Sequence, residues 1–350
     1  RLAETVFALN IPLCTGHELV GLTRDDSGRV TGAEVKGPKG VRRIAAAHGV
    51  VLAAGGYPHD SARRRETFDH VKRGLPHYSM SPVAGTGGAI AAAQAIGAGF
   101  VESNANGGFW TPVSLLPNPD GTRRPFPHLF LDRAKPGVIA VDHHGRRFVN
   151  ESSSYHDFVQ GLIARLLAEG QRSGWLIADQ RAVRRYGLGA AHAFPARIGK
   201  HIASGYLKRA ATLAELAQQC GIDPQGLERS VAGFNAAAAR GEDPEFGKGS
   251  TTYQRYLGDP ENAPNPCLRP LEGPFYAIEI FPGDIGTSMG LDVTGRGEVK
   301  DRDGRVIEGL YACGNDINSI MSGAYPGPGI TLGPALTFGY VIGQVAAGKG

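Results

Sequence analysis

The segment Tyr325–Gly329, Tyr-Pro-Gly-Pro-Gly, constrains the fold more than any other stretch of the chain. Two prolines and two glycines within five residues exclude a helix, because proline fixes φ and lacks an N–H group, while glycine tolerates left-handed backbone. Directly after it, Thr331 fits the N-cap of a helix in which Pro334 lies in the first turn. The following apolar run predicts a helix that is buried on nearly every side (Leu336, Phe338, Tyr340, Val341, Ile342 and Val345).

A short strand and a tight turn precede that loop. Leu310–Cys313 is an apolar run typical of a buried strand, and Gly314-Asn315-Asp316 is typical of a turn. A helix that begins beneath a bare glycine loop directs its first N–H groups and its positive dipole end at something flat or anionic. From the residues alone, a helix packed after an ordinary Gly/Pro turn explains the pattern equally well.

Together these residues resemble the C-terminal flavin-binding signature of the fumarate reductase/succinate dehydrogenase flavoprotein superfamily. Within it, Tyr325–Gly329 resembles the 3-ketosteroid Δ1-dehydrogenase branch, and the resemblance extends over the whole chain. It implies an FAD-dependent oxidoreductase that acts on CH–CH bonds. The implied fold is α/β (α+β): a partial Rossmann-like FAD-binding domain with a β-meander, split by an inserted α+β substrate (cap) domain.

Composition is that of an ordinary globular protein. With 37 basic and 33 acidic residues, the net charge of +4 is too small to indicate a nucleic-acid partner. No apolar run approaches the roughly 18 residues of a transmembrane segment, and no signal peptide is visible. The cysteines lack CxxC spacing, so neither a disulfide framework nor a metal site is predicted, and we expect a reducing, cytoplasmic compartment (Cys14, Cys220, Cys267 and Cys313).

No dinucleotide fingerprint is present. The sequence opens at Arg1 within an amphipathic helical pattern, and Gly97-Ala-Gly99 has Glu102 where the third glycine of G-x-G-x-x-G should stand. The family carries its pyrophosphate-binding βαβ unit at the N-terminus. We therefore expect this sequence to be the C-terminal part of a longer polypeptide, lacking a segment on the order of one domain.

The organisation predicted along the chain has three parts. Residues 1–111 form the first piece of the FAD-binding domain, 112–280 the substrate domain and 281–350 the second FAD-binding piece. Prolines concentrated between residues 112 and 136 mark the first crossing. Helices are expected over 89–96, 157–169, 178–186, 213–220 and 221–239, and strands over 18–23, 29–35, 42–46, 50–53, 138–141, 147–149 and 275–280.

The continuous apolar run Val50–Ala54 predicts a strand covered on both faces. In the family this strand and the residues that end it lie beside the flavin dinucleotide, which would involve Ala54, Gly55 and Gly56. The resemblance also places the backbone of Val20 against the adenine. Without the resemblance, a strand ending in a turn accounts for the same residues.

The stretch from Gly145 to Phe158 resembles the family segment that ends in a catalytic tyrosine, and this assigns Tyr155 as the base that removes the α-proton of a ketone. A tyrosine base requires a pKa lowered by its neighbours; one of these in the family is a tyrosine whose counterpart lies outside this sequence. His156 is a rival acid/base. If the segment is extended, its ring points to the opposite side from Tyr155.

Tyr325 can offer an O–H, and Gly329 a bare backbone N–H, to the ketone oxygen as enolate charge develops. The start of the last helix would direct amides at the pyrimidine edge of the flavin, and Asn315 would bond the ribityl chain. The cofactor-binding residues implied in this region are Gly314, Asn315, Asp316, Ile330, Thr331 and Leu332.

Two departures argue against a dicarboxylate substrate. Fumarate reductases carry a histidine pair where this chain has Gly286-Thr287, and an arginine in the final glycine loop, which here is Gly329–Gly333. The expected substrate is a small hydrophobic ketone, favouring a steroid. A fumarate reductase-type ene-reductase on another substrate, or a non-catalytic fragment, remain alternatives. The sequence identifies no external electron acceptor.

Overall fold

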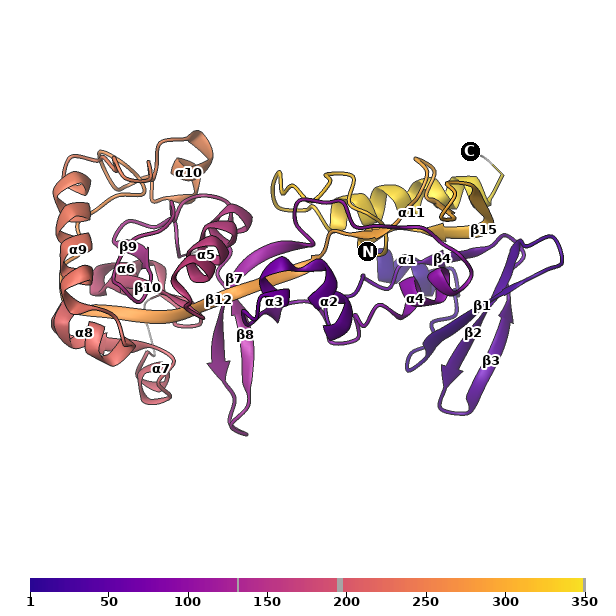
Figure 1. Ribbon diagram of the computed structural model, residues 1–350, viewed down its shortest axis with the longest axis horizontal. Coiled ribbons are helices and arrows are strands. Elements are labelled where there is room, and N and C mark those ends of the chain that lie inside the picture. The colour runs from indigo at the N-terminus through magenta and orange to yellow at the C-terminus, as the bar shows by residue number, and fades with distance from the viewer. Residues whose placement is uncertain (131, 194–197, 349–350) are drawn as a thin grey trace.

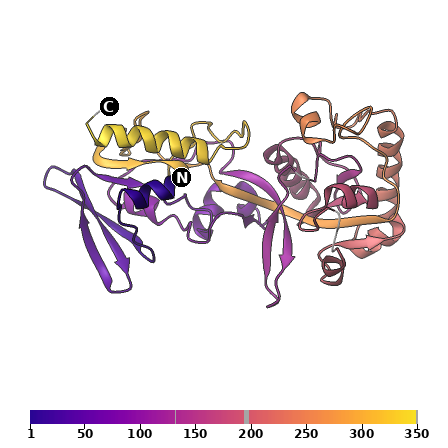
Figure 2. The same cartoon turned by 180° about the vertical axis from the view of Figure 1, so that it is seen from behind.

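The computed structural model describes residues 1–130, 132–193 and 198–348. Its chain forms two lobes joined by long strands, seen from the front in Figure 1 and from behind in Figure 2. The lobe with both chain ends holds the small sheets, and the other holds most of the helices around one larger sheet. The mixed α/β architecture expected from the sequence is confirmed.

β12 (Phe275–Thr287) passes from one lobe into the other (Figure 1). Its first half pairs with β10 (Gly174–Asp179), and its second half pairs with β7 (Gly108–Pro117). The boundaries expected after residues 111 and 280 fall within these paired strands, where Thr111 lies opposite Gly283. The lobes are therefore joined by sheet hydrogen bonds.

The larger sheet has the order β8-β7-β12-β10-β9, with two short strands added to β12. The strand β10 ends where Asp179 caps the next helix by accepting from Ala182 N at 2.7 Å, so the helix expected from residue 178 begins at Gln180. The other strands are β5 (Tyr78–Ser79), β8 (Arg123–Pro127), β9 (Val138–Val141) and β11 (Lys208–Ala210).

Helices surround this sheet, and their ends follow local capping signals. Thr212 and Glu215 form a reciprocal capping box at the start of α8, which has the bounds expected from the sequence. Residues 147–149 form no strand and make a single bridge to β9, at Arg147. The helices are α5 (Tyr155–Glu169), α6 (Gln180–Tyr186), α7 (Gly199–Ala203), α8 (Leu213–Cys220), α9 (Pro224–Ala238) and α10 (Thr252–Leu257).

The first lobe begins with an antiparallel meander of three strands, whose first turn is held by Asp25 as it accepts from Ser27 N and Arg29 N. The strand at 50–53, expected to continue this meander, belongs to a different sheet. A second small sheet is the antiparallel pair of the short strands β6 and β13. The elements are β1 (Glu18–Arg24), β2 (Val30–Gly37), β3 (Gly40–Ala45), α2 (Ser61–Thr67), α3 (Asp69–Lys72), α4 (Gly88–Ala95), β6 (Phe100–Val101) and β13 (Gly290–Leu291).

Two segments far apart in the sequence form a parallel pair in this lobe. β4 (Val50–Leu52) lies beside β15 (Val306–Ala312), and β14 (Glu298–Lys300) pairs with the other edge of β15. Because parallel strands end at one edge, the turns after β4 and β15 meet there, and this is the edge at which open α/β sheets bind ligands.

The expectation that the Val50 run is covered on both faces is wrong. Val51 is 47% exposed, since no described element packs over that side of β4. An apolar run predicts a hydrophobic strand, but it does not predict whether other elements pack on both faces of that strand.

The last helix, α11 (Leu332–Ala346), starts after Thr331 as predicted. Its burial on nearly every side is wrong: Ile342 is the buried residue, while Tyr340 is 70% exposed. One face packs on Gly297 and on the turn at Gly314, and no other described element covers the remaining faces. The apolar sequence predicted the helix, but it did not predict which elements pack against the helix.

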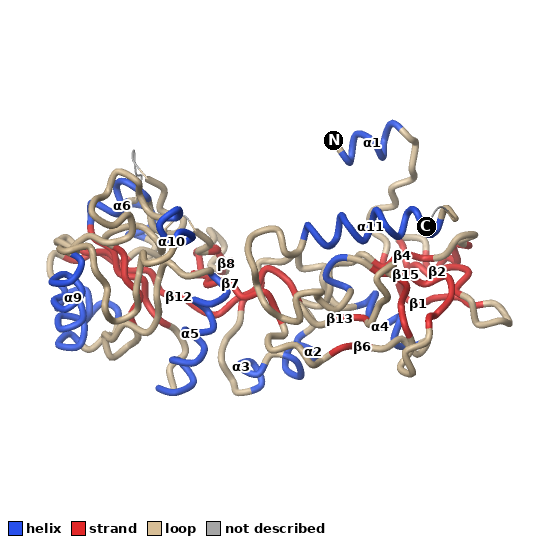
Figure 3. The backbone as a smooth tube through the Cα atoms, turned by 90° about the horizontal axis from the view of Figure 1, so that it is seen from above, coloured by secondary structure: helices blue, strands red, loops and turns tan. Residues whose placement is uncertain are grey.

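The N-terminal helix α1 (Leu2–Ala8) has no buried residue. It stands apart from α11 when the chain is seen from above (Figure 3). None of the helices described in residues 1–130, 132–193 and 198–348 combines the length and hydropathy needed to span a membrane.

Gly309→Ala tests the contact between β15 and the meander. Gly309 has φ +75° and its missing Cβ would collide with the carbonyl of Val30. Gly304 has φ +82° with open space around it, so Gly304→Ala is the matched control. We expect the control to lower the free energy of unfolding by about 1 kcal/mol, and Gly309→Ala to lower it by a further 1–3 kcal/mol, on the order of an overpacked core. Urea denaturation measures both; equal losses would contradict the packing.

Candidate active site

Asp316 joins the two glycine turns. It is fully buried, and its carboxylate accepts hydrogen bonds from Ala54 N and, at 2.9 Å, from Gly56 N. Burial raises the pKa of Asp316, while the backbone N–H groups oppose that rise. Ala54, Gly56 and Asp316, all expected beside the cofactor, are therefore in contact. The Asp316 carboxylate is used to hold the turn at residues 54–56.

A chain of contacts links Val20 to the same turn. Its strand β1 packs on α4, where the carbonyl of Leu19 lies 3.8 Å from the place of a Cβ on Gly88. Gly87, which precedes α4, donates its N–H to the carbonyl of Gly56 at 3.2 Å. Val20 therefore lies on a strand that α4 connects to the glycine turn, rather than in the turn itself.

The turn after β15 also meets the end of β12 and the start of α11. A Cβ on Gly286 would collide with Asn315 Nδ2 and stand 3.7 Å from Thr331 Cγ2. A small pocket lies here, and Thr287 Oγ1 is buried beside it without a hydrogen-bond partner. The pocket is lined by Phe109, Thr287, Gly314, Asn315, Ile317, Ser319, Ile320, Ile330 and Pro334.

The Tyr325–Gly329 loop presents bare main chain. Gly329 has φ +101°, a region open to glycine, and nothing lies within 4 Å of its missing Cβ. The space around Gly327 is equally open. A flat group can therefore approach the backbone at both positions.

Tyr155 and Tyr325 are hydrogen-bonded to each other through their hydroxyl groups. Their ring centroids lie 4.9 Å apart, and the two residues are 3% and 8% exposed. Phe109 and Ile330 complete the apolar cluster around them. Sequence reasoning missed Phe109, because a phenylalanine within a strand carries no functional signal.

The pair is not activated in the way expected. Burial raises the pKa of Tyr155, and Tyr253 adds to this, although the bond from Tyr325 and the charge of Arg133 act downward. Burial also raises the pKa of Tyr325 far above its ordinary value. Among the described residues, Tyr325 and Arg133 do lower the Tyr155 pKa, as a tyrosine base requires, but the effect of burial is larger. Burial therefore favours the protonated form of both phenols, and within the pair one hydroxyl donates its hydrogen bond to the other.

His156 lies beside Tyr325, not on the opposite side. The segment is helical from Tyr155 onward, so the His156 ring stacks between Tyr325 (5.5 Å between centroids) and Trp110 (6.3 Å). Its Nδ1 accepts from Trp110 N at 3.0 Å, and its Nε2 bonds to Gln160 at 3.0 Å. Burial lowers the His156 pKa to about 4. The ring is thus a neutral support for Tyr325 with both nitrogens engaged.

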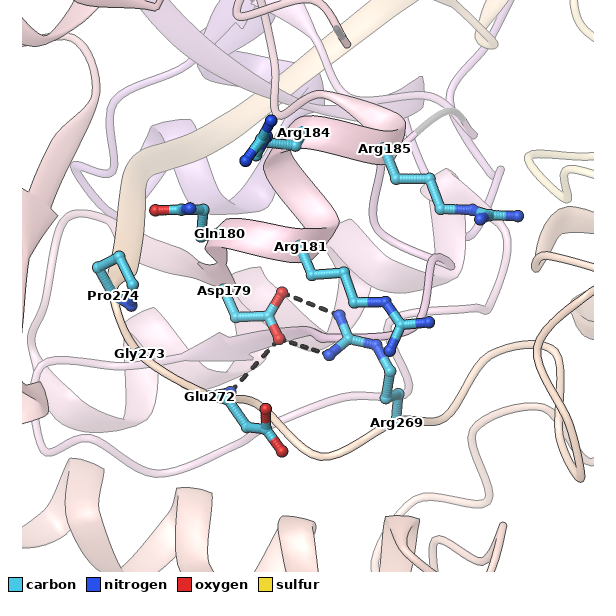
Figure 4. Close-up of a pocket in the computed structure, with 9 residues that line it drawn as sticks. All are labelled: Asp179, Gln180, Arg181, Arg184, Arg185, Arg269, Glu272, Gly273 and Pro274. Carbon is cyan, nitrogen blue, oxygen red and sulfur yellow. Dashed lines mark hydrogen bonds and ion pairs between the residues drawn. The ribbon is translucent and has the colours of Figure 1, made fainter.

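A separate, open pocket lies on the helical lobe (Figure 4). Arg269 clamps Asp179 through two bonds of 2.7 and 2.9 Å, and Arg185 is paired with Asp259 at 2.8 Å. The pocket shares no residue with the tyrosine pair or the glycine turns. Its lining is Asp179, Gln180, Arg181, Arg184, Arg185, Arg269, Glu272, Gly273 and Pro274.

Comparison with known proteins gives a consistent result. A family model described as "FAD binding domain" matches residues 1–332. The chain is 41% identical over 350 residues to 4-oxocyclohex-2-ene-1-carboxylate 5-dehydrogenase of Sinomonas cyclohexanicum, which covers 99% of this chain and 58% of that protein. It is 36% identical over 345 residues to 3-oxosteroid 1-dehydrogenase of Mycolicibacterium smegmatis, covering 95% and 58%.

A solved structure agrees. The crystal structure of 3-ketosteroid Δ1-dehydrogenase from Sterolibacterium denitrificans, in complex with 1,4-androstadiene-3,17-dione, superposes with a TM-score of 0.88 at 35% identity. The match covers 99% of this chain and 62% of that chain. The sequence therefore spans a little more than half of the length of the proteins that it resembles.

The buried state of His156 predicts a pH effect on stability. The folded protein holds the ring neutral down to about pH 4, whereas the unfolded chain binds a proton near 6.5. Stability should therefore fall as pH drops from 6.5 to 4. In His156→Gln, the slope of the unfolding free energy over this window should shrink by up to about 1.4 kcal/mol per pH unit. Denaturation at several pH values measures it.

The exposed His48 supplies the control, since His48→Gln should leave that slope unchanged. His70, whose pKa burial lowers to about 2, keeps its contribution in all these proteins. An unaltered slope in His156→Gln would show that the ring is accessible to protons in the folded state.

Proposed function

The chain belongs to the FAD-binding domain family, and from this premise we propose that it is part of an FAD-dependent dehydrogenase that forms a C=C bond beside the carbonyl of a cyclic ketone. The observation that carries the proposal is the hydrogen-bonded pair of Tyr155 and Tyr325 next to the open backbone of Gly329. A 3-ketosteroid is the favoured substrate. The division into a flavin domain in two pieces, with residues 112–280 as the substrate domain, is part of the proposal.

The residues present fit a flavin. A flat ring system needs bare main chain and N–H donors, and the loop at Gly327 and Gly329 is open. At the start of α11, Gly333 N–H already donates to Gly329 O at 2.7 Å, so the donors have to come from the residues just before Gly333. The unpartnered Thr287 Oγ1 offers a buried polar contact. Ile330, Thr331 and Leu332 would supply amides, Gly55 and Gly56 a turn at the strand edge, and Gly314 and Asn315 the opposing turn.

The protein's share of the chemistry is proton transfer and charge stabilisation. Tyr155 would accept the α-proton of the ketone, with Tyr325 O–H and Gly329 N–H donating to the carbonyl oxygen as it gains enolate charge. When bound, FAD supplies the acceptor for the hydride that leaves the β-carbon. His156 and Phe109 hold the Tyr325 ring in place.

A second candidate substrate is a cyclohexenone that bears a carboxylate, because the relative at 41% identity is named for such a compound. We also propose a reducing, cytoplasmic location, supported by the free state of Cys14, Cys220, Cys267 and Cys313.

Anaerobic flavin bleaching tests the function. In the whole protein, androstenedione should reduce bound FAD, and Tyr155→Phe should slow the reduction by about 10²–10⁴-fold, the usual range for loss of a general base. The exposed Tyr256 gives the control, because Tyr256→Phe should leave the rate unchanged.

Bleaching by 4-oxocyclohex-2-ene-1-carboxylate alone would move the assignment to the second substrate. Bleaching by neither ketone would overturn the proposed reaction, as would full activity in Tyr155→Phe.

A further inference from the structure

Arg133 is a buried cation whose guanidinium is bound entirely by backbone carbonyls. It is 1% exposed. Its Nε donates to His128 O at 2.8 Å, its Nη1 to Glu151 O at 2.9 Å and Ser153 O at 3.3 Å, and its Nη2 to Leu129 O. Every one of these acceptors is neutral.

The nearby carboxylates form their side-chain bonds with groups other than the Arg133 guanidinium. Glu151 forms its bonds with Arg147 at 2.8 and 3.0 Å, and Asp132 bonds to His128 Nδ1 at 2.6 Å. Burying a charge without a directly bonded counterion is costly. Burial lowers the Arg133 pKa to about 10, so the group still carries its charge at neutral pH.

The contacts of Arg133 surround the start of α5, where Tyr155 is the first residue. Ser153 lies two residues before Tyr155, and Leu129 packs against the cluster that holds Tyr155 and Tyr325. The guanidinium carbon also lies 4.7 Å from the centroid of Phe158, one turn further along α5. The positive charge of Arg133 therefore lies close to the first turn of α5, among residues that also pack around Tyr155.

We propose that Arg133 is a positioning residue that stabilises the phenolate of Tyr155 and so allows this tyrosine to act as a base. The inference rests on the proposed function. Arg133 works through Tyr155 without a hydrogen bond to it, and its bonds to the carbonyls of Leu129 and Ser153 hold the guanidinium close to the start of α5.

The electrostatics agree with this geometry. Burial is the largest influence on Tyr155 and raises its pKa, and Arg133 opposes that rise. Positive charge in a low-dielectric wall favours the ionised form of a phenol. Other titratable groups that face Tyr155 or Arg133 are Tyr325, Tyr253, Asp132, Glu151 and Lys248, whose Nζ donates to Arg133 O at 3.2 Å.

The test is the ionisation of Tyr155 itself. A fluorinated tyrosine, whose phenol ionises at lower pH, is placed at position 155 of the whole protein and titrated by ¹⁹F NMR without any ketone. Arg133→Met should raise its pKa by at least about one unit, and Arg133→Lys, which keeps the charge on a less extended donor set, by less.

Phe158→Leu is the matched control, because it disturbs the packing around Arg133 and leaves the charge. Its titration should coincide with that of the unsubstituted protein. If Arg133→Met does not fold, Arg133→Gln decides, because it removes the charge and keeps N–H donors for the carbonyls; a pKa equal to that of the unsubstituted protein then overturns the inference.

A folded Arg133→Met with an unchanged pKa overturns it as well, as does an equal shift in Phe158→Leu. The readout is independent of turnover, so failure of the ketone assays would leave this result standing. In the active protein, the same variants should displace the ascending limb of the pH–rate profile, which reports the base, by the same amount.

Discussion

The hydrogen bond between Tyr155 and Tyr325 is the contact on which the proposed chemistry depends. The two residues are 170 positions apart, so the bond requires the helical lobe and the C-terminal loop to be placed correctly. Ser154 caps α5 by accepting from Asp157 N at 3.1 Å, which fixes where the helix begins and hence where Tyr155 points. On the other side, the Pro/Gly loop limits the positions open to Tyr325.

The rest of the fold surrounds the tyrosine pair with glycine-rich backbone and apolar side chains. The parallel pairing of β4 and β15 places two glycine turns together, and Asp316 ties them through its carboxylate. Apolar side chains then enclose the tyrosines, and this enclosure raises both phenol pKa values. A site that excludes water in this way makes a tyrosine base difficult, unless a buried positive charge such as Arg133 lies nearby.

Local signals in the sequence were sufficient for much of the fold. The capping residues of α8 and the prolines and glycines before α11 set their limits within a few positions. Signals that depend on distant partners failed. The outward faces of α11 and of Val51 could not be foreseen, because hydrophobicity does not identify a neighbour. The position of His156 was predicted wrongly because its segment is helical. Arg133 was not identified because its partners are backbone carbonyls, which cannot be predicted from the pattern of side chains.

A double-mutant cycle on stability tests the central contact most directly. The free energy of unfolding is measured for the unsubstituted protein, Tyr155→Phe, Tyr325→Phe and the double variant. If the two hydroxyls are bonded in the folded protein, the losses are non-additive, with a coupling of about 1 kcal/mol. Strictly additive losses would mean that the hydroxyls do not meet, and the arrangement of the site given above would be wrong.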